Sequence, residues 1–377
     1  MNRSAKAIGC AVAAMSLFAL TACGSSDGSS AGGSTSVGAS KADLQAKVNA
    51  ALAAPTGVGL ETPLEKKPQT GKFVVGILTS LATAKVESAA QGQAAKLLGW
   101  DYKEIQQGSG PEDAAKALDA AVALKPDGII YYGAPRQLME SGLQKAKGAG
   151  IAVVATAQVD PLAPPIIANN SNSGDQLKEL GVGVADYVAL DSDLAGRVAL
   201  VTIPAFPVLK SFSDGLKSEL GSVCPGCKVT EVPQQLTDLG TVTPTSIVSA
   251  LRRDPKIKYV IFDCGCASAG VKAAIDAAGI KDVVLGGEAP LANSITELKD
   301  GSDEAWAALA LPVAGYGLID TLARHFNGES LAPVFAEKPS WQILTKDNIG
   351  DAAIDSQNNY IGYADYAGAF AKLWQVG

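Results

Sequence analysis

From residue 72 onward, the spacing of hydrophobic positions in the chain alternates between two periods. Short apolar runs such as 72–78 (KFVVGIL) and 127–133 (DGIIYYG) predict buried strands, because they are rich in β-branched or aromatic residues and bounded by glycine or polar loops. Segments between them carry apolar residues three or four positions apart, which predicts helices. Strands that alternate with helices of this length indicate βαβ units and parallel sheets.

This alternation occurs in two successive rounds, which predicts two similar lobes. The predicted strands are 72–78, 101–107, 127–133, 151–157, 196–204, 228–235, 257–265 and 282–288. The predicted helices are 86–100, 111–126, 135–150, 173–189, 208–220, 243–255 and 267–279. Three further segments, 303–312, a helix over 313–328 and 339–349, then have to return the chain between the lobes.

The first 22 residues have the layout of a secretory signal peptide. Arg3 and Lys6 precede an apolar run over 8–20. This run is too short to span a bilayer, which takes a helix of about 20 residues. The end of this run, LTAC, resembles the bacterial lipobox, which implies cleavage before Cys23 and attachment of diacylglycerol to its thiol. Two acyl chains hold a protein durably at a membrane surface. The alternative is an ordinary cleaved signal with an incidental cysteine.

The segment after Cys23 supports an anchored protein. Residues 23–40 are dominated by glycine and serine, which predicts a flexible tether. Residues 41–54 then form a short predicted helix, followed by a linker up to residue 71. We therefore expect an exported lipoprotein, held at the outer face of the cell membrane by the lipid on Cys23.

Composition and charge limit the possible partners. Hydrophobic residues make up 47% of the 377 residues and charged residues only 18%, as in an α/β protein with substantial cores. The net charge of −7 argues against nucleic acid or an anionic lipid surface as a partner. No second apolar stretch is long enough to cross a membrane.

Four cysteines follow the tether, in the motifs CPGC and CGC. An exported protein favours disulfides, so a Cys224–Cys227 bridge across the Pro-Gly turn is expected. Cys264 and Cys266 are either bridged or free. The alternative is a single zinc site made of all four thiolates.

The sequence offers little support for catalysis. His325 is the one histidine, so neither a Ser-His-Asp triad nor a histidine metal site can form. No phosphate-binding loop or dinucleotide-binding glycine motif is present. Neighbouring carboxylates occur at Asp186 with Asp191 and at Asp303 with Glu304, which leaves a carboxylate-only glycosidase as an alternative. We expect no enzyme, no cofactor and no metal.

The order of these segments resembles that of a known family. The matching pieces are KFVVGIL, KPDGIIYYG, KAKGAGIAVVATA, IANNSNSG, ALRRDPKIKYVIFDCG, AAIDAAGIKDVVLGG and LTKDNI, between Lys72 and about Ile349. In this order they are similar to type I periplasmic binding proteins of ABC importers, the ribose/galactose-binding group that shares its fold with the ligand domains of LacI-type repressors.

The resemblance implies two Rossmann-like, doubly wound lobes with parallel sheets, joined by three crossovers and closing on a solute. The crossovers are expected near Ala168–Ser171, Ala310–Pro312 and Ile343–Thr345. Lobe 1 is then predicted as 72–169 plus 312–343, and lobe 2 as 170–311 plus 344–377. Ligands of such sheets bind beyond the carboxyl ends of the strands.

Positions that bind sugar in this family differ here. Lys85-Val86 stands in place of the aromatic pair and Ala157-Gln158 in place of an Asp-Arg pair, while Lys210 replaces an arginine and Cys264 an asparagine. Without these polar partners, hydroxyl groups of a bound sugar would be buried without a hydrogen bond, and each would cost about 1–3 kcal/mol of binding free energy. A less hydroxylated or aromatic solute therefore rivals a sugar. The predicted ligand-binding residues are Thr79, Ser80, Lys85, Tyr132, Arg136, Gln158, Phe206, Lys210, Asp263, Cys264, Glu288 and Trp306.

The resemblance implies a monomeric protein that delivers a small solute to an ABC permease in the membrane without changing it. Ligand binding would shift the two lobes toward closure. A lipid-anchored ligand sensor of the same fold is the second hypothesis, and a surface glycosidase is the third.

Overall fold

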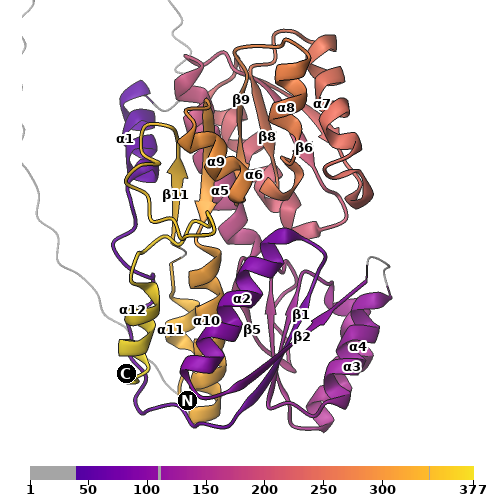
Figure 1. The fold of residues 1–377 in the computed structure, drawn as a ribbon, viewed down its shortest axis with the longest axis vertical. Helices are drawn as coiled ribbons and strands as arrows, with labels where there is room; N and C mark the ends of the chain where they lie inside the picture. Colours follow the sequence, from indigo (N-terminus) through magenta and orange to yellow (C-terminus); the bar gives the residue numbers. More distant parts are fainter. Residues whose placement is uncertain (1–39, 109–111, 339) are drawn as a thin grey trace, which may run out of the picture. The chain divides into compact units, whose positions relative to one another are not determined.

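Two parallel sheets form the centres of two α/β lobes in the computed structural model, which describes residues 40–108, 112–338 and 340–377. The predicted signal peptide, Cys23 and nearly all of the tether lie outside the described residues. Within these residues, no helix has both the length and the apolar character needed to cross a membrane. The predicted fold class, two doubly wound lobes, is confirmed (Figure 1).

Lobe 1 contains a five-stranded parallel sheet in the order β2-β1-β3-β4-β5. Helices α2 and α10 pack against each other on one face, and α3 and α4 cover the other (Figure 1). The bounds are β1 Phe73–Leu78, α2 Ala82–Leu97, β2 Asp101–Gln106, α3 Asp113–Ala123, β3 Gly128–Tyr132, α4 Arg136–Gly148, β4 Ala152–Thr156, β5 Ile166–Ser171 and α10 Leu311–Asn327.

Lobe 2 contains a six-stranded sheet in the order β11-β10-β9-β8-β6-β7, parallel except for β11. Helices α5 and α6 pack together on this lobe, as do α7 and α8. The bounds are α5 Gly174–Asp191, β6 Arg197–Thr202, α6 Pro207–Val223, β7 Lys228–Pro233, α7 Val242–Arg253, β8 Tyr259–Phe262, α8 Val271–Ala277, β9 Val284–Glu288, α9 Ala292–Lys299, β10 Glu304–Leu309 and β11 Trp341–Leu344.

The alternation of side chains between the two faces of a strand explains why continuous apolar runs predicted the buried strands. On β1, Val75 and Ile77 pack toward α3 and α4, whereas Val74 packs on the opposite face of the sheet. A strand covered on both faces needs apolar residues at nearly every position. The same alternation separates Tyr131, which is fully buried in the α3–α4 core, from Tyr132.

The predicted lobe boundaries were partly wrong. Strand β5 continues to Ser171, so the first crossing follows this residue instead of residue 169. Strand β11 pairs with β10 in lobe 2, so the chain has returned before Trp341 and not near Ile343–Thr345. Helix α12 (Tyr366–Leu373), which we expected in lobe 2, packs on α10 of lobe 1 (Figure 1).

An aromatic cluster attaches α12 to α10. Trp374, directly after α12, stacks on Tyr316 with ring centroids 5.7 Å apart. The indole Nε1 of Trp374 donates a hydrogen bond of 2.8 Å to Oδ1 of Asp320. Asp320 also forms a fully buried ion pair with Arg324, 2.6 Å between Oδ2 and Nε. The C-terminus therefore completes the core of lobe 1.

The predicted linker is an ordered part of the fold. Helix α1 (Lys41–Leu52) is fixed to lobe 2, where Lys47 pairs with Glu219 at 2.9 Å and Asp186 at 3.6 Å. The chain then reaches lobe 1, where the amide of Leu64 donates to the carbonyl of Leu373. Because N- and C-terminal segments also pass between the lobes, the described residues contain more crossings than the three expected.

The C-terminal crossing requires a glycine. Gly362 has a φ of +65°, and a Cβ at this position would lie 2.7 Å from Cβ of Ala310 and 2.8 Å from Oγ of Ser340. These two neighbours belong to the other crossings, so several crossing segments meet at this point. A side chain at Gly362 would be excluded both by its backbone conformation and by lack of space.

Replacing Trp374 by alanine should destabilise the protein strongly. The change removes a fully buried indole and leaves Oδ1 of Asp320 without its donor. We expect the free energy of unfolding to fall by about 3–5 kcal/mol, measured by denaturant unfolding. The exposed Lys372→Ala on the same helix is the control, with a change under about 0.5 kcal/mol. Equal stability of the two variants would show that α12 is not part of the lobe 1 core.

Candidate functional site

A small cavity lies where the carboxyl ends of the two sheets approach each other. Its lining comes from the ends of β3, β9 and β10, from the segments that follow β1, β4, β5 and β8, and from the first turns of α2, α5, α6 and α10. It leaves about 20 Å³ for the centres of water molecules, which is room for about one water. The polar side chains in the lining are Thr83, Tyr132, Asn172 and Glu288, and the rest are apolar or sulfur-containing, including Phe206 and Cys264.

Glu288, the last residue of β9, is the one charged side chain in this lining. It is 5% exposed, and within the described ranges its carboxylate makes no hydrogen bond or ion pair. Burial, with a smaller contribution from the nearby Asp263, raises the pKa of Glu288 to about 8. An unpaired buried carboxyl is costly, so Glu288 is the most unusual group in the cavity.

Asp263 lies directly after β8 and close to Glu288. Its Oδ2 accepts a hydrogen bond of 2.9 Å from the amide of Ile203, whereas Oδ1 is buried without a partner among the described residues. Burial raises the pKa of Asp263 to about 7. Two buried carboxyl groups thus end neighbouring strands of lobe 2 at the cavity.

A third buried carboxyl, Glu87 on α2, was missed by the sequence analysis. Its Oε2 accepts from the side-chain amide of Asn172, which lines the cavity, and burial raises the pKa of Glu87 to about 8. Thr83, Glu87 and Gln91 are four residues apart and all buried. This spacing on one helix face was the available signal.

The phenol of Tyr132 is close enough to Glu87 of lobe 1 and Glu288 of lobe 2 to be influenced by the charge of both. Burial raises the pKa of the Tyr132 phenol, and the negative charges of Glu87 and Glu288 raise it further. The tyrosine therefore remains protonated and can donate a hydrogen bond into the cavity.

The structure brings four of the predicted ligand-binding residues around this cavity: Tyr132, Phe206, Cys264 and Glu288. Three more predicted residues, Thr79, Gln158 and Asp263, are buried at strand ends nearby but do not line it. Gln158 uses its amide nitrogen to donate to the carbonyl of Ala134 at 2.8 Å. Ligand contact by any of these residues stays a prediction.

Three predicted residues are exposed and do not reach the cavity. Ser80 precedes α2 at the surface, and Lys85 lies on the outer face of α2 because the helix buries Ala84, Glu87 and Ser88 instead. The side chain of Lys210 is 72% exposed and pairs with Asp214 one turn further along α6. The sequence analysis did not establish which face of each helix these residues occupy.

Two more predicted residues have partners within the protein and do not line the cavity. Arg136 donates two hydrogen bonds of 2.6 Å to the carbonyls of Ala163 and Pro164, so its guanidinium holds a lobe 1 loop. Trp306 is fully buried within β10 and stacks on Phe262, with ring centroids 5.8 Å apart. The two side chains stabilise the scaffold.

The cysteines form two disulfides at opposite ends of the lobe 2 strands. The predicted Cys224–Cys227 bridge lies just before β7, and Cys264 and Cys266 are bridged just after β8. A shared zinc site is therefore excluded by the pairing, and the described residues contain no cluster suited to a metal. Gly265 between the second pair has no room for a side chain, because a Cβ would collide with the carbonyl of Ala289.

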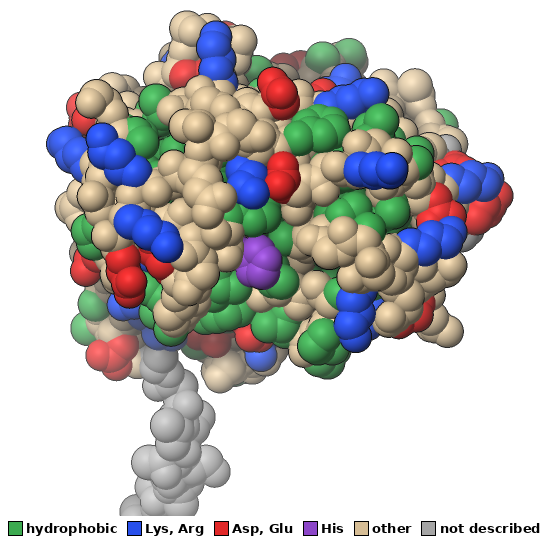
Figure 2. Space-filling model, turned by 90° about the horizontal axis from the view of Figure 1, so that it is seen from below, with side chains coloured by type: hydrophobic (Ala, Val, Ile, Leu, Met, Phe, Trp, Pro, Cys, Tyr) green, Lys and Arg blue, Asp and Glu red, His purple; other side chains and the backbone are tan. Residues whose placement is uncertain are grey.

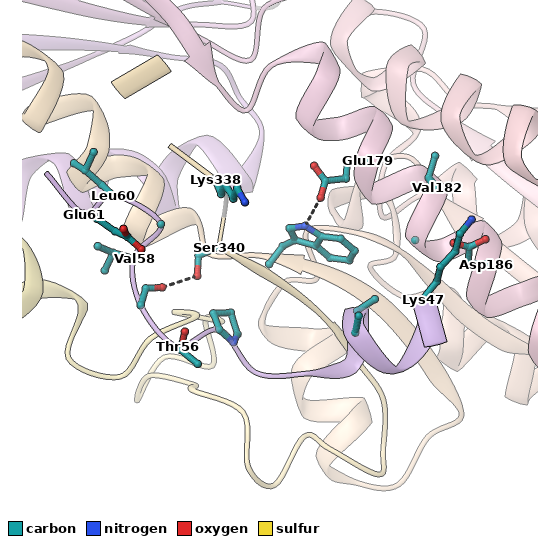
Figure 3. Close-up of a pocket in the computed structure, with 17 residues that line it drawn as sticks. Lys47, Thr56, Val58, Leu60, Glu61, Glu179, Val182, Asp186, Lys338 and Ser340 are labelled. Atoms are coloured by element: carbon teal, nitrogen blue, oxygen red, sulfur yellow. Dashed lines mark hydrogen bonds and ion pairs between the residues drawn. The ribbon is translucent and has the colours of Figure 1, made fainter. Parts of the chain in front are cut away.

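A larger hollow of about 820 Å³ lies beside the crossing segments, away from the strand ends. Figure 3 shows its walls, which come from α1, the segment 55–61, α5 and the three residues Lys338, Ser340 and Trp341. Trp341 donates from Nε1 to Glu179 at 3.3 Å, and Ser340 donates to the carbonyl of Gly57 at 3.3 Å. The first contact holds the start of β11 against α5, and the second joins the N-terminal segment to the return crossing.

His325 is exposed near the end of α10, far along the chain from every loop at the cavity. Figure 2 shows it at the surface among hydrophobic side chains. The neighbouring carboxylates noted in the sequence have structural partners: Asp186 pairs with Lys47 and Asp303 with Lys346. Glu304 accepts from the indole of Trp306.

The chain matches the family described as "Periplasmic binding protein domain" over residues 84–330. No curated protein matches the sequence. Similar solved structures include GanP, a glucose-galactose binding protein from Geobacillus stearothermophilus, with 16% identity, a TM-score of 0.64 and coverage of 74% of this chain and 99% of that one.

Two solute-binding proteins of ABC transporters from Agrobacterium vitis are also similar. One, bound with α-D-tagatopyranose, has 20% identity, a TM-score of 0.64 and coverage of 77% of this chain and 99% of that one. The other, with bound allitol, has 19% identity, a TM-score of 0.63 and coverage of 75% and 98%. At this level of identity the likeness shows the fold.

The buried carboxyl groups make the stability of the ligand-free protein fall with increasing pH. The pKa of Glu87 and of Glu288 is raised in the folded state to about 8, from an ordinary value of 4.5. Their stabilising contribution is complete below about pH 4.5 and is lost as the pH rises through 8. Glu87→Gln and Glu288→Gln should each flatten the fall in unfolding temperature between pH 5 and 8. The control is the exposed Glu65→Gln, and identical slopes for all variants would contradict the assignment.

Proposed function

Because the chain belongs to the periplasmic binding protein family, we propose that it is the extracytoplasmic solute-binding lipoprotein of an ABC importer. It captures one small solute between its lobes and passes it unchanged to a membrane permease. The observation that carries the proposal is the cavity at the carboxyl ends of both sheets, into which Glu288 brings an unpaired carboxyl.

The geometry supports capture by closure. The cavity leaves about 20 Å³, whereas pockets for small ligands measure about 300–1,000 Å³. The lobes must therefore separate for a solute to enter. Closure over the solute would then bury it between Tyr132 of lobe 1 and Phe206 of lobe 2.

Similar structures support a small, uncharged or polar solute as the starting point for a screen. Their printed names mention glucose and galactose, arabinose, tagatopyranose, allose and allitol. Most of the lining in this chain is apolar, which favours a solute with fewer hydroxyls than these.

A thermal-shift screen over sugars, polyols, nucleosides, aromatic acids and amines should identify a stabilising solute. At 100 times its dissociation constant, a solute adds about 2.7 kcal/mol to the stability. Phe206→Ala and Tyr132→Ala should abolish the shift, and Lys210→Ala should keep it because its side chain points to solvent. Mass spectrometry should recover the solute unchanged. A product, or a shift lost only in the Lys210 variant, would contradict the proposal.

The lipid anchor depends on one cysteine. In cells that express the full chain, Cys23→Ser should move the protein from the membrane fraction to the aqueous fraction after detergent phase separation, since the thiol that receives the lipid is lost. Cys10→Ser, within the signal peptide, is the control and should leave the protein with the membranes. Membrane retention of the Cys23 variant would show that the anchor assignment is wrong.

A further inference from the structure

The charges around the cavity all have one sign. Glu288 lines it, Asp263 ends the neighbouring strand, and Glu87 contacts the lining through Asn172. No lysine or arginine belongs to the lining. Three carboxyl groups thus share one small region without a cation of the protein.

The three cationic residues among the predicted ligand-binding residues do not line the cavity. Lys85 and Lys210 are exposed, and Arg136 is held by the carbonyls of the loop 160–165 and by Glu140. The missing positive charge must come from elsewhere when the carboxyl is ionised.

The rest of the lining suits a solute that has an apolar body and a positively charged group. Tyr132 and Phe206 contribute one aromatic ring from each lobe. The electron-rich faces of aromatic rings attract ammonium groups, most strongly where water is excluded. The lining includes four polar side chains, and the amide of Asn172 already donates to Glu87. A sugar with five or six hydroxyls would leave several of them unpaired.

We propose that the solute is a small organic ammonium compound, whose single positively charged nitrogen pairs with Glu288 while a mostly apolar body packs between Tyr132 and Phe206. This inference rests on the proposed function, because it names the chemical class of the solute for the same cavity. The lack of a cation in the lining disfavours anionic solutes, and the apolar walls disfavour neutral polyols.

Binding of a cation is coupled to release of a proton. Glu288 is faced by Asp263 from β8, Tyr132 from β3 and, beyond Tyr132, Glu87 from α2. None of these groups supplies a positive charge, and burial raises the pKa of Glu288 to about 8. An ammonium ion favours the ionised carboxylate, so affinity should rise with pH until the carboxyl is ionised without a ligand.

Matched pairs of compounds test the proposal by isothermal titration calorimetry at pH 6, 7 and 8.5. The pairs are cyclohexylmethylamine with cyclohexylmethanol and 2-phenylethylamine with 2-phenylethanol, and neutral monosaccharides and polyols are added. At least one amine should bind 100-fold or more tightly than its alcohol. Its affinity should increase between pH 6 and 8 by up to tenfold per unit.

Two isosteric variants provide the controls. Glu288→Gln should weaken amine binding by at least tenfold and remove the pH dependence, whereas Glu65→Gln should change neither. Unfolding of each variant without ligand confirms that it is folded, and Asp263→Asn serves as a second site variant if Glu288→Gln fails to fold.

The outcomes separate this inference from the proposed function. Binding of a neutral sugar or polyol that survives Glu288→Gln overturns the ammonium proposal and leaves a solute-binding protein. Equal binding of an amine and its alcohol overturns it as well. Failure of every amine, sugar and polyol to bind overturns both.

Discussion

Every strand of a parallel sheet delivers its following loop to the same edge, and the candidate site depends on this constraint. Here two sheets bring their carboxyl ends to one cavity, so residues as distant in sequence as Tyr132 and Glu288 become neighbours. The helices on both faces fix the strands, and the crossings near Ala310 and Gly362 fix the sheets as a pair. The loops can therefore differ in chemistry while the scaffold remains that of its family.

Desolvation dominates the chemistry at this edge. Glu87, Asp263 and Glu288 are all buried, and burial is the largest cause of the raised pKa in each. Asp320 in the core of lobe 1 is instead paired with Arg324. The carboxyl groups near the cavity have no such ion pair among the described residues, and this difference is the basis for the proposed role of Glu288.

The two lobes, most strands and the position of the cleft could be predicted from the sequence, because strands buried on both faces consist of nearly continuous apolar runs. The sequence analysis failed where the prediction depended on which face of a helix or strand is buried. Lys85 and Glu87 are two positions apart on α2, and only the helical phase set by Ala84 and Ser88 shows which one is buried. The burial of Trp306 depends on which face of β10 its side chain occupies, which the sequence did not show. The position of α12 depends on the contact between Trp374 and Tyr316, two residues that are distant in the sequence. The periodicity of apolar residues predicts helices and strands, whereas tertiary contacts determine what each face of a helix or strand packs against.

The stack between Trp374 and Tyr316 also has a consequence for folding. It joins two rings that are 58 positions apart in the sequence, so a long loop of chain must close before the core of lobe 1 is complete. The entropy of closing such a loop is lost before the contact is gained, and contacts of this kind slow folding. The aromatic cluster is therefore expected to form late, after the local βαβ units of lobe 1.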